Sequence, residues 1–194
     1  MHNSPTYDTI TQTLISFMKI TIIGTHSTGK TTIINTMQEY LLKTKKTVTI
    51  LKELSRECPF PINENTTLTA QAWILDNQIK KEQAIDHSNG LLISDRSSID
   101  NFAYMYRAIG ESLPHKYEKQ AVEHMASYDF IYKTQKLEID AKKDKVRSTD
   151  YEFRDNIDWL IINLLEKHNI PYINLPATTD TATHIDYIMQ SSNF

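Results

Sequence analysis

The residue types and spacing needed to bind a polyphosphate occur in one stretch of eight residues, Gly24-Thr25-His26-Ser27-Thr28-Gly29-Lys30-Thr31. The stretch matches the pattern G-x-x-x-x-G-K-[ST]. Two glycines let the backbone turn tightly enough for successive N–H groups to point at one phosphate cluster, and a following helix adds the positive end of its dipole. Lys30 is expected to reach the β- and γ-phosphates, and the Thr31 hydroxyl to ligate Mg²⁺. These residues, with Thr32 after them, are predicted to bind a nucleoside triphosphate.

The residues on either side of this stretch have the patterns that the motif requires. An apolar, β-type run precedes it (Phe17 to Ile23) and a helical pattern follows it (Thr32 to Leu42). This is the strand, glycine loop and helix order of phosphate-binding loops. The alternative is an ordinary strand-turn-helix in which Lys30 is merely solvated. The flanking patterns favour the phosphate-binding loop.

A second set of charged residues follows two other predicted strands. Asp95 and Arg96 come directly after an apolar run, and Glu53 and Arg56 follow a β-rich run. Because ligands of an open parallel sheet bind outside the carboxyl ends of its strands, these residues are predicted to lie near the substrate. Asp95 fits the carboxylate on the Mg²⁺ side, and Arg96 suits a site that holds a second anionic or polar substrate. A capping role for Asp95, and a solvated helix start for Glu53 and Arg56, stay open.

The most charged segment of the chain runs from Glu138 to Asp155, after the fourth predicted strand. A mixed-charge run is usually a solvated surface. In phosphoryl transfer, however, positive charge must be brought over the transferring group after the substrates bind, commonly by a moving segment. We therefore interpret about residues 138–155 as a lid. Arg147 and Arg154 are its first candidates for phosphate binding, since a guanidinium holds phosphate in a bidentate fork.

Strand and helix patterns alternate along the chain. Apolar runs with β-branched residues predict strands, and apolar positions at helical spacing predict helices. Thr66 or Thr67 is predicted to cap the start of one helix, and Gly110 the end of another. Strands are predicted over 17–23, 47–51, 91–94, 128–133 and within 169–175, and helices over about 30–42, 68–86, 99–109, 114–127, 149–168 and 182–190.

Length and composition limit the kinds of protein that this chain can be. Its 194 residues, 40% of them hydrophobic and 23% charged, fit one compact domain. The net charge is −3, so the chain lacks the excess of basic residues that is typical of a domain that binds double-stranded nucleic acid. One cysteine and no apolar run of membrane-spanning length predict a cytoplasmic protein without a membrane partner. We interpret residues 1–17 as an extension, because Met18 directly precedes the first strand, and residues 18–194 as the domain.

The order of these motifs resembles that of a known family. The glycine loop, Glu53, a glutamine-bearing helix, Asp95-Arg96-Ser97 and an arginine-containing lid resemble the nucleoside and nucleotide kinase group of P-loop proteins. Within that group the chain is similar to the deoxynucleoside kinases, the thymidylate kinases, and the nicotinamide riboside kinase domains with related predicted ATPases. The resemblance covers about residues 18–175.

The resemblance implies a role for each motif on the donor side. Residues 24–32 would hold ATP and Mg²⁺, with Thr31 and Asp95 at the metal and Lys30 at the transferring phosphates. Arg147 would serve as a lid arginine. Relatives often have Gly where Lys145 stands, so the chain departs from the family pattern within the lid.

On the acceptor side, the resemblance implies that Glu53 or Asp95 accepts the proton of the substrate hydroxyl. Arg96 would hold the acceptor near the transferring phosphoryl group. Asp95 stands where many deoxynucleoside kinases have Glu, which leaves open which of the two carboxylates is the base.

The fold we predict is a three-layer α/β sandwich of the P-loop kinase type. It has a five-stranded parallel sheet in the order 2-3-1-4-5, helices on both faces and a lid after strand four. The predicted function is ATP- and Mg²⁺-dependent phosphoryl transfer to a nucleoside-like or nucleotide small molecule. One alternative, less favoured, is a 5′-hydroxyl polynucleotide kinase whose basic lid holds nucleic acid. Another is a P-loop ATPase acting as a switch or repair component, against which Arg96 speaks.

Overall fold

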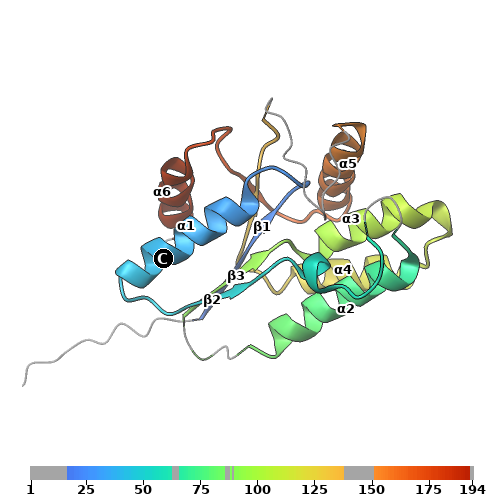
Figure 1. Cartoon of the computed structure of the whole chain (residues 1–194), viewed down its shortest axis with the longest axis horizontal. Coiled ribbons are helices and arrows are strands. Elements are labelled where there is room, and N and C mark those ends of the chain that lie inside the picture. Colours follow the sequence, from blue (N-terminus) through green and yellow to red (C-terminus); the bar gives the residue numbers. More distant parts are fainter. Residues whose placement is uncertain (1–16, 63–65, 86–87, 89, 138–150, 193–194) are drawn as a thin grey trace, which may run out of the picture.

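The computed structural model describes residues 17–62, 66–85, 88, 90–137 and 151–192. These residues form a five-stranded parallel sheet in the order β2-β3-β1-β4-β5 (Figure 1). The predicted α/β fold and strand order are therefore confirmed. The strands are β1 (Met18–Ile23), β2 (Val48–Leu51), β3 (Leu91–Asp95), β4 (Phe130–Lys133) and β5 (Ile173–Asn174).

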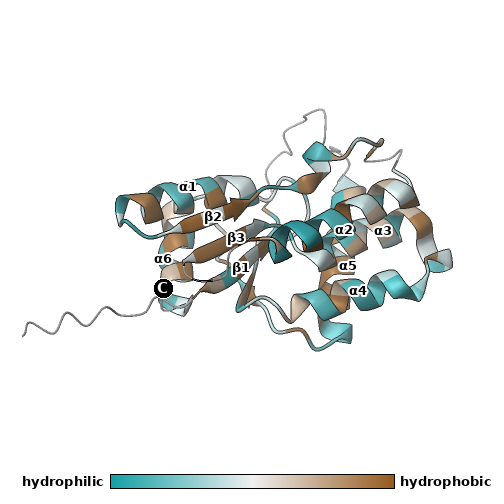
Figure 2. Ribbon diagram, turned by 90° about the horizontal axis from the view of Figure 1, so that it is seen from below, coloured by the Kyte–Doolittle hydropathy of each residue, from teal (hydrophilic) through white to brown (hydrophobic). Residues whose placement is uncertain are grey.

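Helices cover both faces of the sheet and give it three layers (Figure 1). One apolar cluster joins α1 and α6 to one face, and a second joins α2, α3, α4 and α5 to the other. Figure 2 shows apolar residues concentrated on β2 and β3 and many polar residues on α2 and α4. The helices are α1 (Lys30–Lys43), α2 (Leu68–Gln83), α3 (Ser98–Ile109), α4 (His115–Met125), α5 (Tyr151–Lys167) and α6 (Thr181–Ser192), with 3-10 turns η1 (Leu54–Glu57) and η3 (Gly110–Ser112).

The central strand β1 is apolar along most of its length because both of its faces are covered. Successive side chains of a strand point to opposite faces. Ile20 and Ile22 accordingly pack with α1 and α6, whereas Ile23 packs with the helices on the other side. All three are at most 1% exposed. This burial fixes the register of β1 and therefore the place where the chain leaves it.

Three strands end at the same edge of the sheet. Ile22 pairs with Asp95 of β3, and Ile23 pairs with Lys133 of β4. The backbone continues this pairing one residue further, because the N–H of Arg96 donates to the carbonyl of Ile22 at 3.1 Å. The segments that follow β1, β3 and β4 are thus brought side by side, as the sequence analysis expects for a ligand site.

The helix caps predicted at Thr67 and Gly110 are present in the structure. The Thr67 hydroxyl accepts from the N–H of Ala70 at 3.2 Å and so caps α2. Gly110, with a φ of 73°, ends α3 as predicted. The start of α3 is capped by Ser97, so the alternative in which Asp95 caps a helix is wrong. Asp95 is instead the last residue of β3, at the edge of the sheet where a ligand could bind.

Some predictions fall outside the described residues. Arg147 and residues 138–150 of the predicted lid lie there, as does nearly all of the predicted extension. The last part of the lid range, residues 151–155, belongs to the first turns of α5. Among the helices that the structure describes, none is long and apolar enough to cross a membrane.

Candidate functional site

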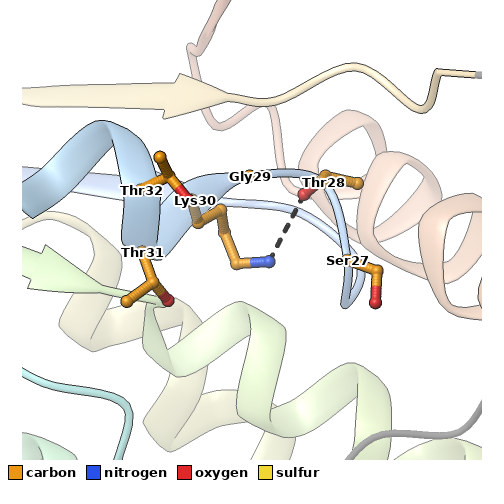
Figure 3. A pocket seen from close by; sticks show the side chains of 6 residues that line it. All are labelled: Ser27, Thr28, Gly29, Lys30, Thr31 and Thr32. Carbon is orange, nitrogen blue, oxygen red and sulfur yellow. Dashed lines mark hydrogen bonds between the residues drawn. The ribbon is translucent and has the colours of Figure 1, made fainter. Parts of the chain in front are cut away.

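The loop between β1 and α1 is shaped by residues with unusual backbone conformations. Gly24, Ser27 and Gly29 have φ angles of 135°, 58° and 83°. A Cβ atom at Gly24 would lie 2.5 Å from the Thr134 hydroxyl oxygen, so only glycine fits there. Ser27 to Thr32 line a small hollow that opens to solvent (Figure 3). The hollow lies at the start of α1, where the sequence predicts phosphate binding.

Lys30 folds back across this loop. Its Nζ lies 2.8 Å from the carbonyl oxygen of Gly24 and 2.5 Å from that of Thr25. It also lies 3.5 Å from the hydroxyl of Thr28 (Figure 3). Burial, followed by the nearby charge of Arg96, lowers the pKa of Lys30 from its ordinary value to about 7. In this arrangement the amine is held by the loop's own carbonyl groups, next to the hollow where a phosphate would bind.

Thr31 and Asp95 meet beside the hollow. The Thr31 hydroxyl donates to Oδ2 of Asp95 at 2.8 Å. Oδ1 of Asp95 is buried and has no hydrogen-bond partner among the described residues. Burial raises the pKa of Asp95, and Glu53 adds to this, while Lys30 and Arg96 oppose it. A hydroxyl and a carboxylate with a spare buried oxygen fit Mg²⁺, which prefers oxygen ligands.

Arg96 and Glu53 form a buried ion pair next to the loop. Arg96 Nε lies 2.7 Å from Glu53 Oε1, and each side chain is less than a tenth exposed. The guanidinium also lies 3.4 Å from the carbonyl oxygen of Gly24 and 4.8 Å above the ring of Tyr104. Burial alone would lower the pKa of Arg96, but Glu53 and nearby acidic groups outweigh it and hold the pKa well above its ordinary value.

Asp100 is a residue of this site that the sequence analysis missed. It is fully buried at the start of α3 and accepts the N–H of Gly24 at 2.9 Å. It also accepts the N–H of Ser97 at 3.0 Å and the Ser97 hydroxyl at 2.8 Å, which completes a capping box. The spacing Ser97-x-x-Asp100 is a sequence signal for such a cap, but it does not indicate the contact with the loop.

Aromatic residues from two helices line the other side of the loop. The His26 ring lies 3.3 Å from the Tyr104 hydroxyl through Nδ1, and its centroid is 5.7 Å from that of Phe153. The ring centroids of Tyr104 and Phe153 are 6.1 Å apart. The start of α5 therefore lies against the phosphate-binding loop.

Arg154, the second predicted lid arginine, follows Phe153 on α5. Its side chain is only 3% exposed, and its Nε has no hydrogen-bond partner among the described residues. One turn further along the helix, Asp158 binds Lys133 at 2.9 Å, and the adjacent Thr134 contacts the Thr28 hydroxyl at 2.7 Å. Arg154 is therefore carried on a helix that contacts both the loop and the segment beside it.

The structure brings most of the predicted site residues together. Residues 24–32, Asp95, Arg96 and Glu53 share one edge of the sheet. Glu53 does start a helix, as its alternative expects, because it is the N-cap residue of η1, but it is not solvated, since its side chain is only 6% exposed. Arg56 lies at the margin: its side chain is 43% exposed and its Nε is 3.5 Å from Glu53.

Comparisons with known proteins agree with this geometry. A family model described as an AAA domain matches residues 19–182. Deoxyadenosine kinase from M. mycoides has a similar structure, with a TM-score of 0.65 and 20% identity over 91% of this chain and 98% of that one. Thymidylate kinase from Ehrlichia chaffeensis gives a TM-score of 0.59 and 17% identity over 92% and 97% of the two chains.

A third similar structure is that of the NadR protein in complex with NR, with a TM-score of 0.70 and 18% identity. The match covers 91% of this chain and 52% of the NadR chain, so this chain corresponds to about half of that protein. A search of curated proteins found no match. Identities this low show a shared fold, and the family model covers most of the chain. The chain belongs to the AAA domain family and has the fold of the P-loop nucleoside and nucleotide kinases.

Proposed function

We propose that the protein transfers the γ-phosphoryl group of ATP, with Mg²⁺, to a nucleoside-like or nucleotide small molecule. The observation that carries this proposal is the buried Glu53–Arg96 pair, whose guanidinium lies 3.4 Å from the carbonyl of Gly24 at the phosphate-binding loop. A loop that only binds and hydrolyses a nucleotide has no need of a second, buried pair of charges directly beside it. A site for an acceptor does, because the acceptor must be oriented and deprotonated.

The donor side would use the residues of the loop. Thr31 and the free oxygen of Asp95 would hold Mg²⁺, which neutralises phosphate charge when bound. Lys30 would exchange its bonds to the carbonyls of Gly24 and Thr25 for bonds to the β- and γ-phosphates. The backbone N–H groups at the start of α1 would bind the remaining phosphate oxygens.

The acceptor side would use Glu53 and Arg96. Asp95 would be occupied with Mg²⁺ together with Thr31, which leaves Glu53 as the candidate base. Arg96 would bind the acceptor beside the γ-phosphate. As the acceptor oxygen forms its bond to phosphorus and the bond to the ADP oxygen breaks, the hydroxyl proton would pass to the Glu53 carboxylate. Arg154 is the described arginine best placed to add positive charge from α5.

The fold of the comparison proteins supports this class of reaction. Two of them are kinases by name, one for deoxyadenosine and one for thymidylate, and the NadR structure contains NR. The net charge of −3 favours a small acceptor over a nucleic acid strand. One cysteine in 194 residues agrees with a reducing, cytoplasmic location.

A transfer assay tests the proposal. The full chain is incubated with γ-labelled ATP and Mg²⁺ together with deoxyadenosine, thymidine monophosphate, nicotinamide riboside or a 5′-hydroxyl oligonucleotide. We expect label in one of the small molecules, and loss of the label with Lys30→Ala and with Glu53→Gln.

Two outcomes would replace the proposal with one of its alternatives. Label in the oligonucleotide, with binding that weakens steeply as salt rises, would identify a polynucleotide kinase. Release of labelled phosphate with no phosphorylated acceptor, stimulated by a macromolecule, would identify an ATPase.

A further inference from the structure

A second group of buried charged and polar side chains lies away from the phosphate-binding loop. At its centre is Glu82 of α2, which is 0% exposed. Its carboxylate lies 2.6 Å from Lys19 Nζ, 2.7 Å from His124 Nε2 and 2.8 Å from the Tyr128 hydroxyl. Burial by itself would raise the pKa of Glu82, but His124 and Lys19 outweigh it and lower the pKa to about 2. Glu82 is therefore ionised at neutral pH and can only accept hydrogen bonds.

The ionised carboxylate fixes the orientation of Gln78, one turn earlier on α2. Gln78 Nε2 lies 2.5 Å from Glu82 Oε1 and 2.6 Å from the Ser94 hydroxyl, which itself donates to Glu82 at 2.8 Å. Because Glu82 accepts only, the amide nitrogen of Gln78 must face it. The same nitrogen lies 3.2 Å from the carbonyl oxygen of Arg96. The buried group thus reaches the backbone of the candidate acceptor site.

The backbone of Arg96 needs such support. Its φ is 80°, in the left-handed region, which is unfavourable for a residue with a side chain. Its carbonyl oxygen accepts from Gln78 and from the Thr21 hydroxyl, 3.0 Å away. On the other side of the same peptide, the N–H of Ser97 donates to Asp100, which also accepts the N–H of Gly24. The peptide group between residues 96 and 97 is therefore hydrogen-bonded on both sides. Its carbonyl accepts from Gln78 and Thr21, and its N–H donates to Asp100, which also binds the phosphate-binding loop.

We propose that Thr21 and Gln78 are positioning residues for Arg96. By holding its carbonyl group, they keep residue 96 in the left-handed conformation that directs the guanidinium to Glu53 and to the loop. Neither side chain needs to touch a substrate, and both are at most 1% exposed. The inference rests on the proposed function, because that proposal assigns Arg96 to the acceptor.

Two variants remove the support, and two others act as controls. Thr21→Val removes the hydroxyl with little change of shape, and Gln78→Met removes the amide. Thr21→Ser keeps the hydroxyl and should rescue the effect of Thr21→Val. Tyr128→Phe removes a hydrogen bond from the same Glu82 carboxylate but does not touch Arg96, so it measures the effect of weakening the buried group alone.

The first measurement is steady-state kinetics. It uses the small molecule that receives the labelled phosphate in the transfer assay. We expect Thr21→Val and Gln78→Met each to lower kcat/KM for that acceptor about 10-fold, since small misplacements of a binding group are costly, with KM for ATP within about twofold of the wild type. Tyr128→Phe should lower the melting temperature while leaving kcat/KM unchanged. Equal losses in Tyr128→Phe and in the two Arg96-directed variants, at matched melting temperatures, would overturn the proposal.

Hydrogen exchange of the Arg96 Nε–H, followed by NMR, gives a measurement that needs no acceptor. The wild-type proton should exchange slowly because it is buried against Glu53. Thr21→Val and Gln78→Met should speed this exchange about 10-fold, and Thr21→Ser and Tyr128→Phe should not. Unchanged exchange in both Arg96-directed variants overturns the inference even if transfer is observed. Faster exchange in a protein that phosphorylates no acceptor upholds the positioning and rejects the proposed function.

Discussion

Asp95 has two carboxylate oxygens with different surroundings. One accepts the Thr31 hydroxyl, and the other is buried without a partner among the described residues. A buried oxygen that lacks a partner costs free energy unless a ligand satisfies it. At the scale of single residues, this is the feature that separates the roles of Asp95 and Glu53, since Glu53 already binds Arg96.

The substitution Asp95→Asn tests that separation. Asn can still accept the Thr31 hydroxyl, but it lacks the charge for Mg²⁺. We expect kcat to fall roughly 100-fold or more, with a much smaller change in ATP affinity. Steady-state kinetics over a range of Mg²⁺ concentrations provide the measurement, with Asp186→Asn on the exposed side of α6 as a matched control. An unchanged kcat would contradict a role for Asp95 at the metal.

The loop before α1 depends on a close approach between two segments. Gly24 lies against Thr134, the residue after β4, and has a φ of 135°. Gly110, at the end of α3, has a φ of 73° but has nothing within 4 Å of an added Cβ. At the scale of elements, Gly24 therefore has both a positive φ and a crowded position, whereas Gly110 has a positive φ alone.

Replacement of each glycine by alanine measures the two effects. Gly110→Ala should lower the free energy of unfolding by about 1–3 kcal/mol, because its φ of 73° and ψ of −154° lie in a region that is essentially restricted to glycine. Gly24→Ala should lower it by more and should also abolish ATP binding, because the loop must move away from Thr134. Urea unfolding and calorimetric titration with ATP provide the measurements. Equal effects of the two substitutions would show that the contact with Thr134 is unimportant.

The sequence predicts the elements well because their signals are local. The glycine motif, the alternation of strands and helices, and the caps at Thr67 and Gly110 all depend on neighbouring residues. Strand five is shorter than the apolar run predicts: only Ile173–Asn174 pair with β4. Partnerships across the fold could not be predicted in this way, since the contacts of Asp100 with the loop and of Gln78 with Arg96 arise only when α2 and α3 pack on the sheet.

Glu82 ties together parts of the chain that are far apart in sequence. It joins α2 to β1 through Lys19, and to α4 through His124. Its folded pKa of about 2 lies below the ordinary value of 4.5. A lowered carboxyl pKa gives stability that is fully present above pH 4.5 and is lost as the pH falls toward 2. At the scale of the whole molecule, Glu82 is thus predicted to contribute to unfolding in acid.

The variant Glu82→Gln should show this in two ways. At pH 7 it should lower the free energy of unfolding by about 3–5 kcal/mol, because Lys19 and His124 lose their buried partner. Between pH 4.5 and 3 its stability should fall less than that of the wild type. Urea unfolding at several pH values provides the measurement, and Glu118→Gln, which alters a partly exposed carboxylate bound to Lys167, should have a smaller effect. Parallel pH profiles for wild type and Glu82→Gln would contradict the prediction.

Two truncated chains test where the domain begins. Phe17 packs against an apolar cluster beside β2 and α2, whereas Met18 is the first residue of β1. We expect chains starting at Phe17 and at Met18 to bind ATP within about twofold of the full chain, since the contacts of the loop come from later residues. The shorter chain should melt at a lower temperature. Loss of ATP binding in both would show that the first 16 residues take part in the site.

Helix α3 carries three contacts on consecutive turns of one face. Asp100 holds the loop at Gly24, Tyr104 stacks on Arg96, and Arg107 lies 5.5 Å above the ring of Phe153 at the start of α5. Helix α3 therefore contacts the proposed donor site, the proposed acceptor site and the start of α5. Because one helix contacts both proposed sites, a shift of α3 when one reactant binds would reach the other site, and we expect the affinities of the two reactants to depend on each other.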